Sequence, residues 1–516
     1  MNKELQICDC TLRDGGYYTK WDFSETLVKA YLNAMNDIPA ITHIEIGYRS
    51  MPEKEYFGEY FYCPEYVLKM AKTLCPSKQI AIMLNEKDTK VEELDELLVP
   101  FRDYIDLVRI AVAPVNLERA SNFGKEIKER GFKVAFNIMY MSQWAGDMEF
   151  IKKLNQLEGV VDYIYMVDSF GGVYPDDVRT AIQNVKKEVS IPIGFHGHNN
   201  LELGLANTLV AIENGCEIVD ATITGMGRGA GNLKMELLLT CLFSKGLIQK
   251  INYTKLNAIV ATFEKLQVQY KWGTNMPYMI SGAYSLPQKD VMSWISKNRY
   301  TTESIINALQ NQKDNLKDNY QVPVLKSNVK ADEVVIIGGG HNAELHAHAL
   351  KILCLKRPDI ILIHAGTRYV ELFNNLPNKQ FYCLLGAEGY KLQKSLDKLK
   401  LDNISVLLEP SPRQMGTILP EGIIPITYEL GAITFIDQYP DSLLTIALQL
   451  SIDLEAKTVA LFGFDGYDLH TEEQMIEVSK ENQLLIDAYS KNVNPLISLT
   501  PSFYQGFETI SIYSKL

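Results

Sequence analysis

The residues with the clearest chemical potential are two histidines in the segment GFHGHNN, residues 194–200. His196 and His198 end an apolar run typical of a β-strand, and side chains two positions apart on a strand point to the same face. Two imidazoles on one face can hold a single divalent cation between them. We therefore interpret the pair as metal ligands, in preference to two polar residues near a turn.

A carboxylate would complete such a ligand set. Asp9 ends an apolar run in the segment ICDCTLRDGG, residues 7–16, and we predict it as the third ligand rather than as a cap or turn residue. Two histidines and one carboxylate leave positions for water and substrate. Such a set suits Mn²⁺ or Mg²⁺, with Zn²⁺ and Co²⁺ as alternatives.

Arg13 follows Asp9 within the same segment. Its planar guanidinium can bind a carboxylate or stabilise the oxygen of a developing enolate, whereas a rim ion pair is the plainer alternative. Asp14 is expected to orient Arg13. Gly15 and Gly16 predict a tight turn beside the site, because glycine tolerates unusual backbone angles.

The elements that must position these residues follow from a repeating pattern. Short apolar, β-branched runs alternate with amphipathic, charge-rich segments, which predicts a parallel sheet with helical crossovers. The runs lie near residues 5–9, 43–47, 79–84, 105–112, 132–138, 161–168, 191–196 and 217–224. Eight strands in this length predict a (β/α)₈ barrel, with a doubly wound open sheet as the alternative.

The rest of the chain divides into further parts. We predict a barrel domain at 1–236, a helical extension at 237–310, a polar linker at 311–332 and a Rossmann-like α/β domain at 333–516. In the last part, strand-like runs again alternate with helical segments. The fold class is therefore α/β, with two separate parallel sheets.

Other polar residues end predicted barrel strands, where the carboxyl-terminal face of a barrel gathers its active site. Glu45, Arg109, Asp168 and the adjacent Ser169 are candidates for substrate contact. A buried structural hydrogen bond is an equally consistent role for each of them.

Composition excludes several classes of protein. The 516 residues carry 51 Lys and Arg against 63 Asp and Glu, a net charge of −12, so the chain is a poor candidate for nucleic-acid binding. No apolar stretch is long enough for a membrane span. The eight cysteines are sparse and we expect them to be reduced, which favours a cytoplasmic location. A homo-oligomer is left open.

Three segments together resemble a known family. CDCTLRDGG (8–16), GFHGHNN (194–200) and DATITGMGRGAGN (220–232) are similar to the signature stretches of the metal-dependent DRE-type TIM-barrel aldolases, lyases and acyl-CoA condensing enzymes. That superfamily includes 4-hydroxy-2-oxovalerate aldolase and 3-hydroxy-3-methylglutaryl-CoA lyase. The resemblance covers about residues 1–290, and MVDSFGGVYP (166–175) favours the aldolase branch.

The resemblance implies roles for particular residues. It implies the metal ligands Asp9, His196, His198 and, as a further ligand, Asn232. It implies that Arg13 stabilises the enolate oxygen. It also implies that a tyrosine after the barrel, such as Tyr284, reaches the substrate, although a role in helix packing is the simpler alternative for Tyr284. The substrates implied are a 2-oxo acid such as pyruvate and an aldehyde.

One position departs from the family pattern. The hydroxy-oxovalerate aldolases carry a catalytic histidine where this chain has Tyr17, and the Glu-Gln pair of the condensing enzymes is replaced by Gly16 and Tyr17. An ordinary tyrosine has a pKa of about 10 and is a poor base at neutral pH. Tyr17 is therefore a candidate proton carrier, and the base stays unassigned.

The Rossmann-like part carries weaker signals. Gly338 and Gly340 follow a predicted strand in IIGGGHNAEL and could cradle a phosphate, or form a plain turn. The passage 441–468, which ends in LFGFDGYD, resembles sugar-phosphate transferases and sialyltransferase-like proteins of surface-glycan pathways. That resemblance implies a nucleotide or sugar site at Ser442 and Asp465.

These observations predict a divalent-metal-dependent lyase that makes or breaks a carbon–carbon bond through the enolate of a 2-oxo acid, with a role in surface-polysaccharide sugar synthesis as an extension. An acyl-CoA-dependent Claisen condensing enzyme is the first alternative. A non-catalytic barrel that acts as a scaffold or ligand sensor is the second. A facial-triad iron oxygenase would share two histidines and a carboxylate, but the surrounding motifs disfavour it.

Overall fold

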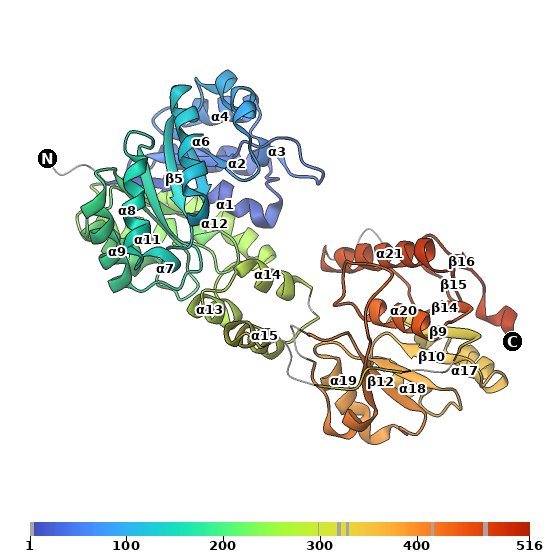
Figure 1. The fold of residues 1–516 in the computed structure, drawn as a ribbon. Coiled ribbons are helices and arrows are strands. Elements are labelled where there is room, and N and C mark those ends of the chain that lie inside the picture. The colour runs from blue at the N-terminus through green and yellow to red at the C-terminus, as the bar shows by residue number, and fades with distance from the viewer. Residues whose placement is uncertain (1–4, 298, 317–320, 327–329, 414–416, 468–472) are drawn as a thin grey trace. The chain divides into compact units, whose positions relative to one another are not determined.

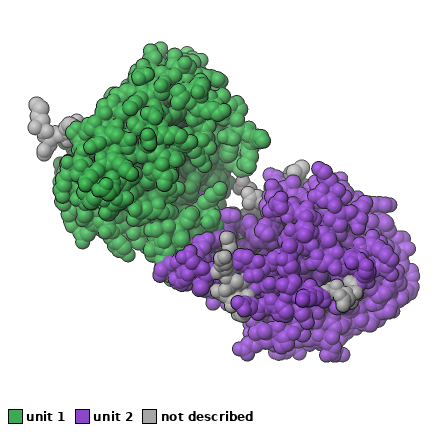
Figure 2. Space-filling view, viewed as in Figure 1, with its two compact units in different colours: residues 1–291 green, residues 292–516 purple. Residues whose placement is uncertain are grey.

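The computed structural model describes residues 5–297, 299–316, 321–326, 330–413, 417–467 and 473–516 (Figure 1). The chain forms two compact units, Met1–Val291 and Met292–Leu516, which Figure 2 colours separately. Each unit contains its own parallel sheet, as the sequence predicts.

The first unit is a closed barrel of eight parallel strands in sequential order, with β1 paired to β8. The strands are β1 (Gln6–Asp9), β2 (His43–Tyr48), β3 (Gln79–Asn85), β4 (Leu107–Val112), β5 (Lys133–Ile138), β6 (Tyr163–Asp168), β7 (Ile193–Gly197) and β8 (Ile218–Ala221). Each of the eight predicted apolar runs overlaps one strand. The closure confirms the (β/α)₈ barrel and excludes the open sheet.

Helices surround this barrel because each carries one apolar stripe that must be buried. In α2, for example, Val28, Leu32 and Met35 are buried, and Ser24 caps the helix by accepting the N–H of Leu27. The helices of the unit are α1 (Thr11–Thr19), α2 (Glu25–Asn36), α3 (Glu59–Tyr62), α4 (Glu65–Leu74), α5 (Leu94–Leu98), α6 (Leu117–Glu129), α7 (Met141–Trp144), α8 (Met148–Lys153), α9 (Pro175–Glu188), α10 (Gly204–Glu213), α11 (Met235–Ser244), α12 (Tyr253–Tyr270), α13 (Met276–Ala283) and α14 (Gln288–Ser296).

The boundary between the units lies within α14, N-terminal to the predicted linker at 311–332. Polar contacts explain the difference. Lys297 Nζ donates to Asp441 at 2.7 Å, and Arg299 Nη2 donates to Glu481 at 2.7 Å, so the segment before α15 (Thr302–Asp314) is fixed to the second unit. Part of the predicted linker also joins that unit, because Leu325 N–H donates to the Glu429 carbonyl at 2.8 Å.

The second unit is built on one parallel sheet of eight strands in the order β13-β12-β11-β10-β9-β14-β15-β16. The strands are β9 (Glu333–Ile337), β10 (Ile361–His364), β11 (Gln380–Cys383), β12 (Ile404–Leu408), β13 (Thr427–Glu429), β14 (Thr458–Phe462), β15 (Leu496–Ser498) and β16 (Glu508–Thr509). The sequence pattern predicted five of them, from its apolar runs at 333–340, 360–364, 380–385, 404–408 and 458–463. It missed β13, β15 and β16, which have only two or three residues each and therefore no readable alternation.

Alternating side chains of the central strands enter two separate cores, so both faces of this sheet are covered. Val334 and Ile336 pack with α20 (Leu443–Asp453) and α21 (Glu473–Asn492), whereas Val335 and Ile337 pack on the other side. The remaining helices are α16 (His341–Leu345), α17 (Ala347–Lys356), α18 (Val370–Phe373) and α19 (Glu388–Ser395). This doubly wound arrangement confirms the Rossmann-like α/β prediction.

Candidate active site

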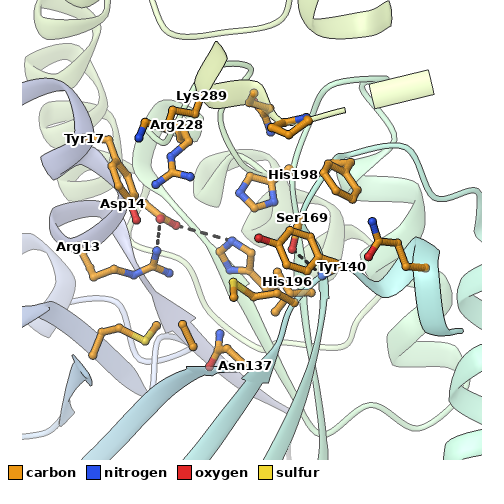
Figure 3. A pocket seen from close by; sticks show the side chains of 18 of the residues that line it. Arg13, Asp14, Tyr17, Asn137, Tyr140, Ser169, His196, His198, Arg228 and Lys289 are labelled. Atoms are coloured by element: carbon orange, nitrogen blue, oxygen red, sulfur yellow. Dashed lines mark hydrogen bonds and ion pairs between the residues drawn. The ribbon is translucent and has the colours of Figure 1, made fainter. Parts of the chain in front are cut away.

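A cavity of about 380 Å³ opens at the carboxyl-terminal ends of the barrel strands. Figure 3 shows Arg13, Asp14, His196 and His198 directed into it. The loop between β8 and α11 contributes Arg228 to its wall. The cavity therefore lies where barrel enzymes place their catalytic groups.

Both histidines are oriented by a hydrogen bond to the ring nitrogen that lies away from the other groups. His196 Nδ1 lies 2.8 Å from Asp220 Oδ2, and His198 Nδ1 lies 2.8 Å from the carbonyl oxygen of Asp168. Burial lowers the pKa of His198 to about 3, so its imidazole is neutral. This arrangement leaves the Nε2 atom of each ring as the ligand atom and fixes its tautomer.

The carboxylate that meets these rings is Asp14. Its Oδ2 lies 3.7 Å from His196 Nε2 and accepts a 2.7 Å hydrogen bond from Asn232 Nδ2. Burial opposes its ionisation, yet the pKa of Asp14 is lowered, mainly by the positive charge of Arg13. Asn232 Oδ1 is buried and has no hydrogen-bond partner among the described residues, so it too is available as a ligand.

The structure turns Asp9 away from this group, which corrects its expected role. Asp9 does not line the cavity, and its Oδ1 accepts hydrogen bonds from the N–H of Thr11 at 2.8 Å and from the hydroxyl of Tyr31. Burial raises the pKa of Asp9 to about 6. The cause is that α1 begins directly after the strand and carries Asp14, rather than Asp9, over the barrel mouth.

The expected turn at Gly15 and Gly16 is also corrected, because both glycines lie inside α1. A Cβ on Gly15 would lie 2.5 Å from the sulfur of Met226, and one on Gly16 would lie 2.1 Å from the ring of Trp21. These glycines thus allow close packing of α1, which holds Arg13 and Asp14 at the cavity.

Beneath the cavity, charged side chains form a continuous buried network. Arg13 Nε donates to Glu45 at 2.7 Å, Arg109 lies 3.2 Å from the same carboxylate, and Arg109 also pairs with Asp220. Asp220 in turn holds His196. Glu45 and Arg109 are fully buried and do not line the cavity, so the expectation that they contact substrate is replaced by a supporting role.

Of the remaining candidates, Ser169 lines the cavity, whereas Asp168 and Tyr284 do not. The Asp168 carboxylate accepts the N–H groups of Gly172 and Val173 and thereby shapes its own loop. Asp168 therefore acts on the site only through its carbonyl group, which holds His198.

Tyr17 lines the cavity, and its hydroxyl lies 3.1 Å from that of Tyr48. The guanidinium of Arg228 lies 3.9 Å from the Tyr17 ring centroid. Sequence reasoning missed Tyr48, Tyr140, Arg228, Gln288 and Lys289 as lining residues. Arg228 was visible as the one cation of the DATITGMGRGAGN segment. The others lie outside any motif: Tyr48 ends β2, Tyr140 follows β5, and Gln288 and Lys289 begin α14.

The second unit contains a separate cavity of about 520 Å³. Three of its four predicted residues, Gly340, Ser442 and Asp465, line it together. Gly338 does not. A Cβ on Gly338 would lie 2.6 Å from the Gly463 carbonyl, so this glycine permits two loops to approach each other.

Two whole-chain expectations can be compared with the structure. All eight cysteines are free thiols, as expected from their spacing. Among the described residues, the helices are too short or too polar to cross a membrane.

Comparison with known proteins agrees with the barrel geometry. The model of the HMGL-like family matches residues 110–262. The 4-hydroxy-2-oxovalerate aldolase of Thermomicrobium roseum is 31% identical over 271 residues, which are 49% of this chain and 70% of the relative. The oxaloacetate decarboxylase of Mycobacterium tuberculosis is 25% identical over 256 residues, covering 49% and 75% of the two chains.

A solved structure extends the match to the fold. The crystal structure of the N-terminal domain of an aldolase candidate from Bacteroides vulgatus is 50% identical, with a TM-score of 0.56, and the match covers 59% of this chain and 100% of that domain. Through its barrel unit, this chain belongs to the HMGL-like family of metal-dependent TIM-barrel lyases and aldolases.

Proposed function

We propose that the barrel unit cleaves or forms a carbon–carbon bond next to the carbonyl group of a 2-oxo acid, with pyruvate as the common product or substrate. The observation that carries this proposal is the convergence of Asp14, His196 and His198 beside Arg13 in one cavity. It pairs a ligand set for a divalent cation with a cation suited to an enolate oxygen.

The donor set fits a divalent metal ion. Both imidazoles are held through Nδ1 and present Nε2, the Asp14 carboxylate is ionised, and Asn232 Oδ1 is buried without a partner among the described residues. Two nitrogens with two oxygens suit Mn²⁺ or Mg²⁺, with Co²⁺ and Zn²⁺ as alternatives. When bound, such an ion supplies Lewis-acid polarisation of the substrate carbonyl.

Arg13 is placed to stabilise the enolate. Its Nε donates to Glu45 and its Nη1 to Asp14, whereas Nη2 meets no acceptor within the described part of the chain. A guanidinium fixed on two sides needs little reorganisation when negative charge develops on a substrate oxygen. We assign that oxygen to Nη2.

Arg228 is suited to the carboxylate of the 2-oxo acid. It lies at the cavity wall, stacks on Tyr17 and forms no ion pair with any described carboxylate. Arginine binds carboxylates through two parallel N–H groups, which would also fix the direction of the carbonyl group.

The proton carrier is assigned to the hydroxyl pair of Tyr17 and Tyr48. Burial raises the pKa of Tyr48, so this hydroxyl retains its proton and can donate it through Tyr17 to the carbon atom of the enolate. Protonation of the enolate completes cleavage, and the reverse step, removal of a C3 proton from pyruvate by the same pair, is slow because tyrosine is a weak base at neutral pH.

A tyrosine pair that donates a proton more readily than it removes one favours a second candidate reaction through the same enolate, the decarboxylation of a 2-oxo diacid. Loss of CO₂ leaves the enolate directly and requires no base to remove a proton, which fits a site with tyrosine in place of the histidine. The similarity to an oxaloacetate decarboxylase supports this reading.

The test is metal-dependent proton exchange at C3 of pyruvate in deuterium oxide, followed by NMR with Mn²⁺ or Mg²⁺. We expect exchange in the natural protein and loss of it in His196→Ala and Arg13→Ala, with Asp9→Asn as a control that retains it. Release of CO₂ from oxaloacetate and cleavage of 4-hydroxy-2-oxo acids then separate the two candidates. Absence of exchange together with thiol release from acyl-CoA would replace the proposal by a condensing enzyme, and absence of all of these reactions would favour a non-catalytic barrel.

A further inference from the structure

The cavity of the second unit lies at the point where the order of the sheet reverses. From β9 the chain builds the sheet outward through β10, β11, β12 and β13, and it then returns to place β14 on the other side of β9. The segments that follow β9 and β14 therefore lead to helices on opposite faces of the sheet, α17 on one face and α21 on the other. The cavity is lined by these two loops, at Gly339–His341 and Gly463–Tyr467. Open parallel sheets bind ligands in this crevice.

The amino terminus of α20 is directed at the same cavity. Ser442, Leu443 and Leu444 line it, and the eleven-residue helix begins at Leu443. Ser442 occupies the capping position without a side-chain capping bond, so the amides of the first turn remain for a ligand. A helix amino terminus favours an anion through these amides and through the helix dipole.

The Ser442 side chain gives an independent indication of a ligand. Its residue is only 2% exposed and lines the cavity, and its hydroxyl accepts no capping hydrogen bond from α20. Buried hydroxyls are nearly always satisfied, because an unmade bond costs about 1–3 kcal/mol. A group that enters the cavity would satisfy it.

The charges around the cavity favour an anionic group. Arg368 forms no ion pair with a described carboxylate and donates only to the Gly339 carbonyl at 2.9 Å. The other two cations are already paired, Lys391 with Glu388 and Arg299 with Glu481. Arg368 is therefore the cation free to meet a bound anion.

The cavity also presents an acceptor. Asp465 Oδ2 accepts the N–H of Asn342 at 2.9 Å, whereas Oδ1 is buried and has no partner among the described residues. A carboxylate with a free oxygen recognises a hydroxyl group of a ligand and repels a second anion. The cavity thus combines an anion site with a hydroxyl site.

We propose that the second unit binds a phosphorylated, hydroxyl-bearing metabolite in this cavity, with the phosphate at Ser442, the first turn of α20 and Arg368, and with a hydroxyl group at Asp465. A nucleotide and a sugar phosphate share this chemistry. The proposal concerns the second unit alone and does not depend on the reaction of the barrel.

Isothermal titration calorimetry on the full chain tests the proposal with four probes: inorganic phosphate, pyrophosphate, uridine monophosphate and glucose 1-phosphate. Uridine and glucose serve as uncharged controls. We expect at least one organic phosphate to bind with a Kd below about 1 mM, and neither uncharged control to do so. Binding by the nucleotide alone or by the sugar phosphate alone identifies the source.

Variants assign the binding to this cavity. Arg368→Gln, at an exposed side chain, should weaken binding about tenfold, and Ser442→Ala should weaken it several-fold. Asp465→Asn should weaken the organic phosphate but not inorganic phosphate. Lys400→Gln, at an exposed cation outside the cavity, and Arg228→Gln, in the barrel cavity, should leave the Kd unchanged.

Two results would overturn the proposal. One is the absence of heat with all four probes at millimolar concentration. The other is a loss of affinity in Arg228→Gln that Arg368→Gln does not share, because the phosphate would then occupy the barrel. Unchanged thermal stability of each variant without ligand confirms that the effects arise at the site.

Discussion

The two cavities of this chain hold their charges in opposite ways. In the barrel, Arg13 and Arg109 are buried and each is fixed by buried carboxylates, which continue through Asp220 to His196. In the second unit, Arg368 and Lys391 are exposed at the rim, and the floor is built from glycine loops and the amino terminus of a helix. In the barrel cavity the charged side chains are held in place before the substrate binds, whereas in the cavity of the second unit the charged side chains can still change their conformation.

This difference follows from what each site is proposed to do. Charge that develops during a reaction is stabilised best by groups already desolvated and oriented, since no reorganisation is then needed at the moment of reaction. Such a network is costly, because each buried ion loses several kcal/mol of hydration. A site that only binds an anion can use backbone amides, which carry no desolvated net charge.

The sharpest test of the barrel site compares two aspartates of one segment. Asp14→Asn should reduce kcat/KM about 10³-fold and weaken Mn²⁺ binding, because a ligand worth several kcal/mol of Lewis-acid stabilisation is lost. Asp9→Asn should retain metal and most activity, since Asp9 is bonded to Thr11 and Tyr31 outside the cavity. Calorimetry with Mn²⁺ measures both variants. Metal loss in Asp9→Asn with retention in Asp14→Asn would restore the original assignment.

The buried network predicts the largest effect on stability. Asp220→Asn leaves Arg109 with one carboxylate fewer in a fully buried position, and we expect a loss of about 3–5 kcal/mol in the free energy of unfolding of the barrel. The matched change in the second unit is Asp441→Asn, where Lys297 is partly exposed, and it should cost about 1 kcal/mol or less. Urea unfolding of both variants measures the contrast, and equal losses would contradict it.

The fold was largely predictable because its elements repeat. Each barrel strand is an apolar run bounded by charged segments, and this pattern can be recognised in the sequence without any knowledge of tertiary contacts. The short strands β13, β15 and β16 were missed, since two or three residues acquire their structure from neighbours. Likewise, the pairing of Lys297 and Arg299 with the second unit is a tertiary contact that moves the domain boundary away from the polar segment that suggested it.

The site was predictable where a side chain's position follows from strand alternation. His196 and His198 meet this condition. The choice between Asp9 and Asp14 as the ligand could not be predicted in this way, because it depends on where α1 begins and on the close packing of Gly15 against Met226. Glu45 and Arg109 were identified as important polar residues, but sequence alone does not tell whether a strand-end side chain faces the cavity or the network below it.

A pH titration extends the comparison to two buried neutral histidines that do not line the cavities, one in each unit. Burial lowers the pKa of His43 in the barrel and of His364 in the second unit to about 4, against an ordinary value of about 6.5. The unfolded chain therefore takes up these protons first as the pH falls. Stability is complete above about pH 6.5 and is lost between there and pH 4, by about 2 kcal/mol per histidine at pH 5.

The control is His364→Asn, which should remove this pH dependence from the second unit while that of the barrel remains. Urea unfolding between pH 7.5 and 5, followed by tryptophan fluorescence and circular dichroism, measures it. A pH dependence of the second unit that persists in His364→Asn would assign the effect to carboxylates instead, and the proposed cause would be discarded.

The smallest expected effect separates binding from chemistry at the barrel itself. Arg228 lies at the cavity wall and has no carboxylate partner among the described residues, so it resembles Arg368 more than it resembles Arg13.

Arg228→Gln should therefore raise KM for the 2-oxo acid about tenfold and leave kcat nearly unchanged, because a carboxylate contact made equally in ground state and transition state contributes only uniform binding. Arg13→Gln, by contrast, should lower kcat about 10²–10³-fold with little change in KM, since its contact strengthens only as the enolate forms. Steady-state kinetics at saturating Mn²⁺ distinguishes the two arginines. A fall in kcat of the same size in both variants would place Arg228 in the chemical step. The two arginines of this cavity would then not differ in role, and the contrast between a buried arginine that stabilises the enolate and a wall arginine that only binds substrate would be wrong.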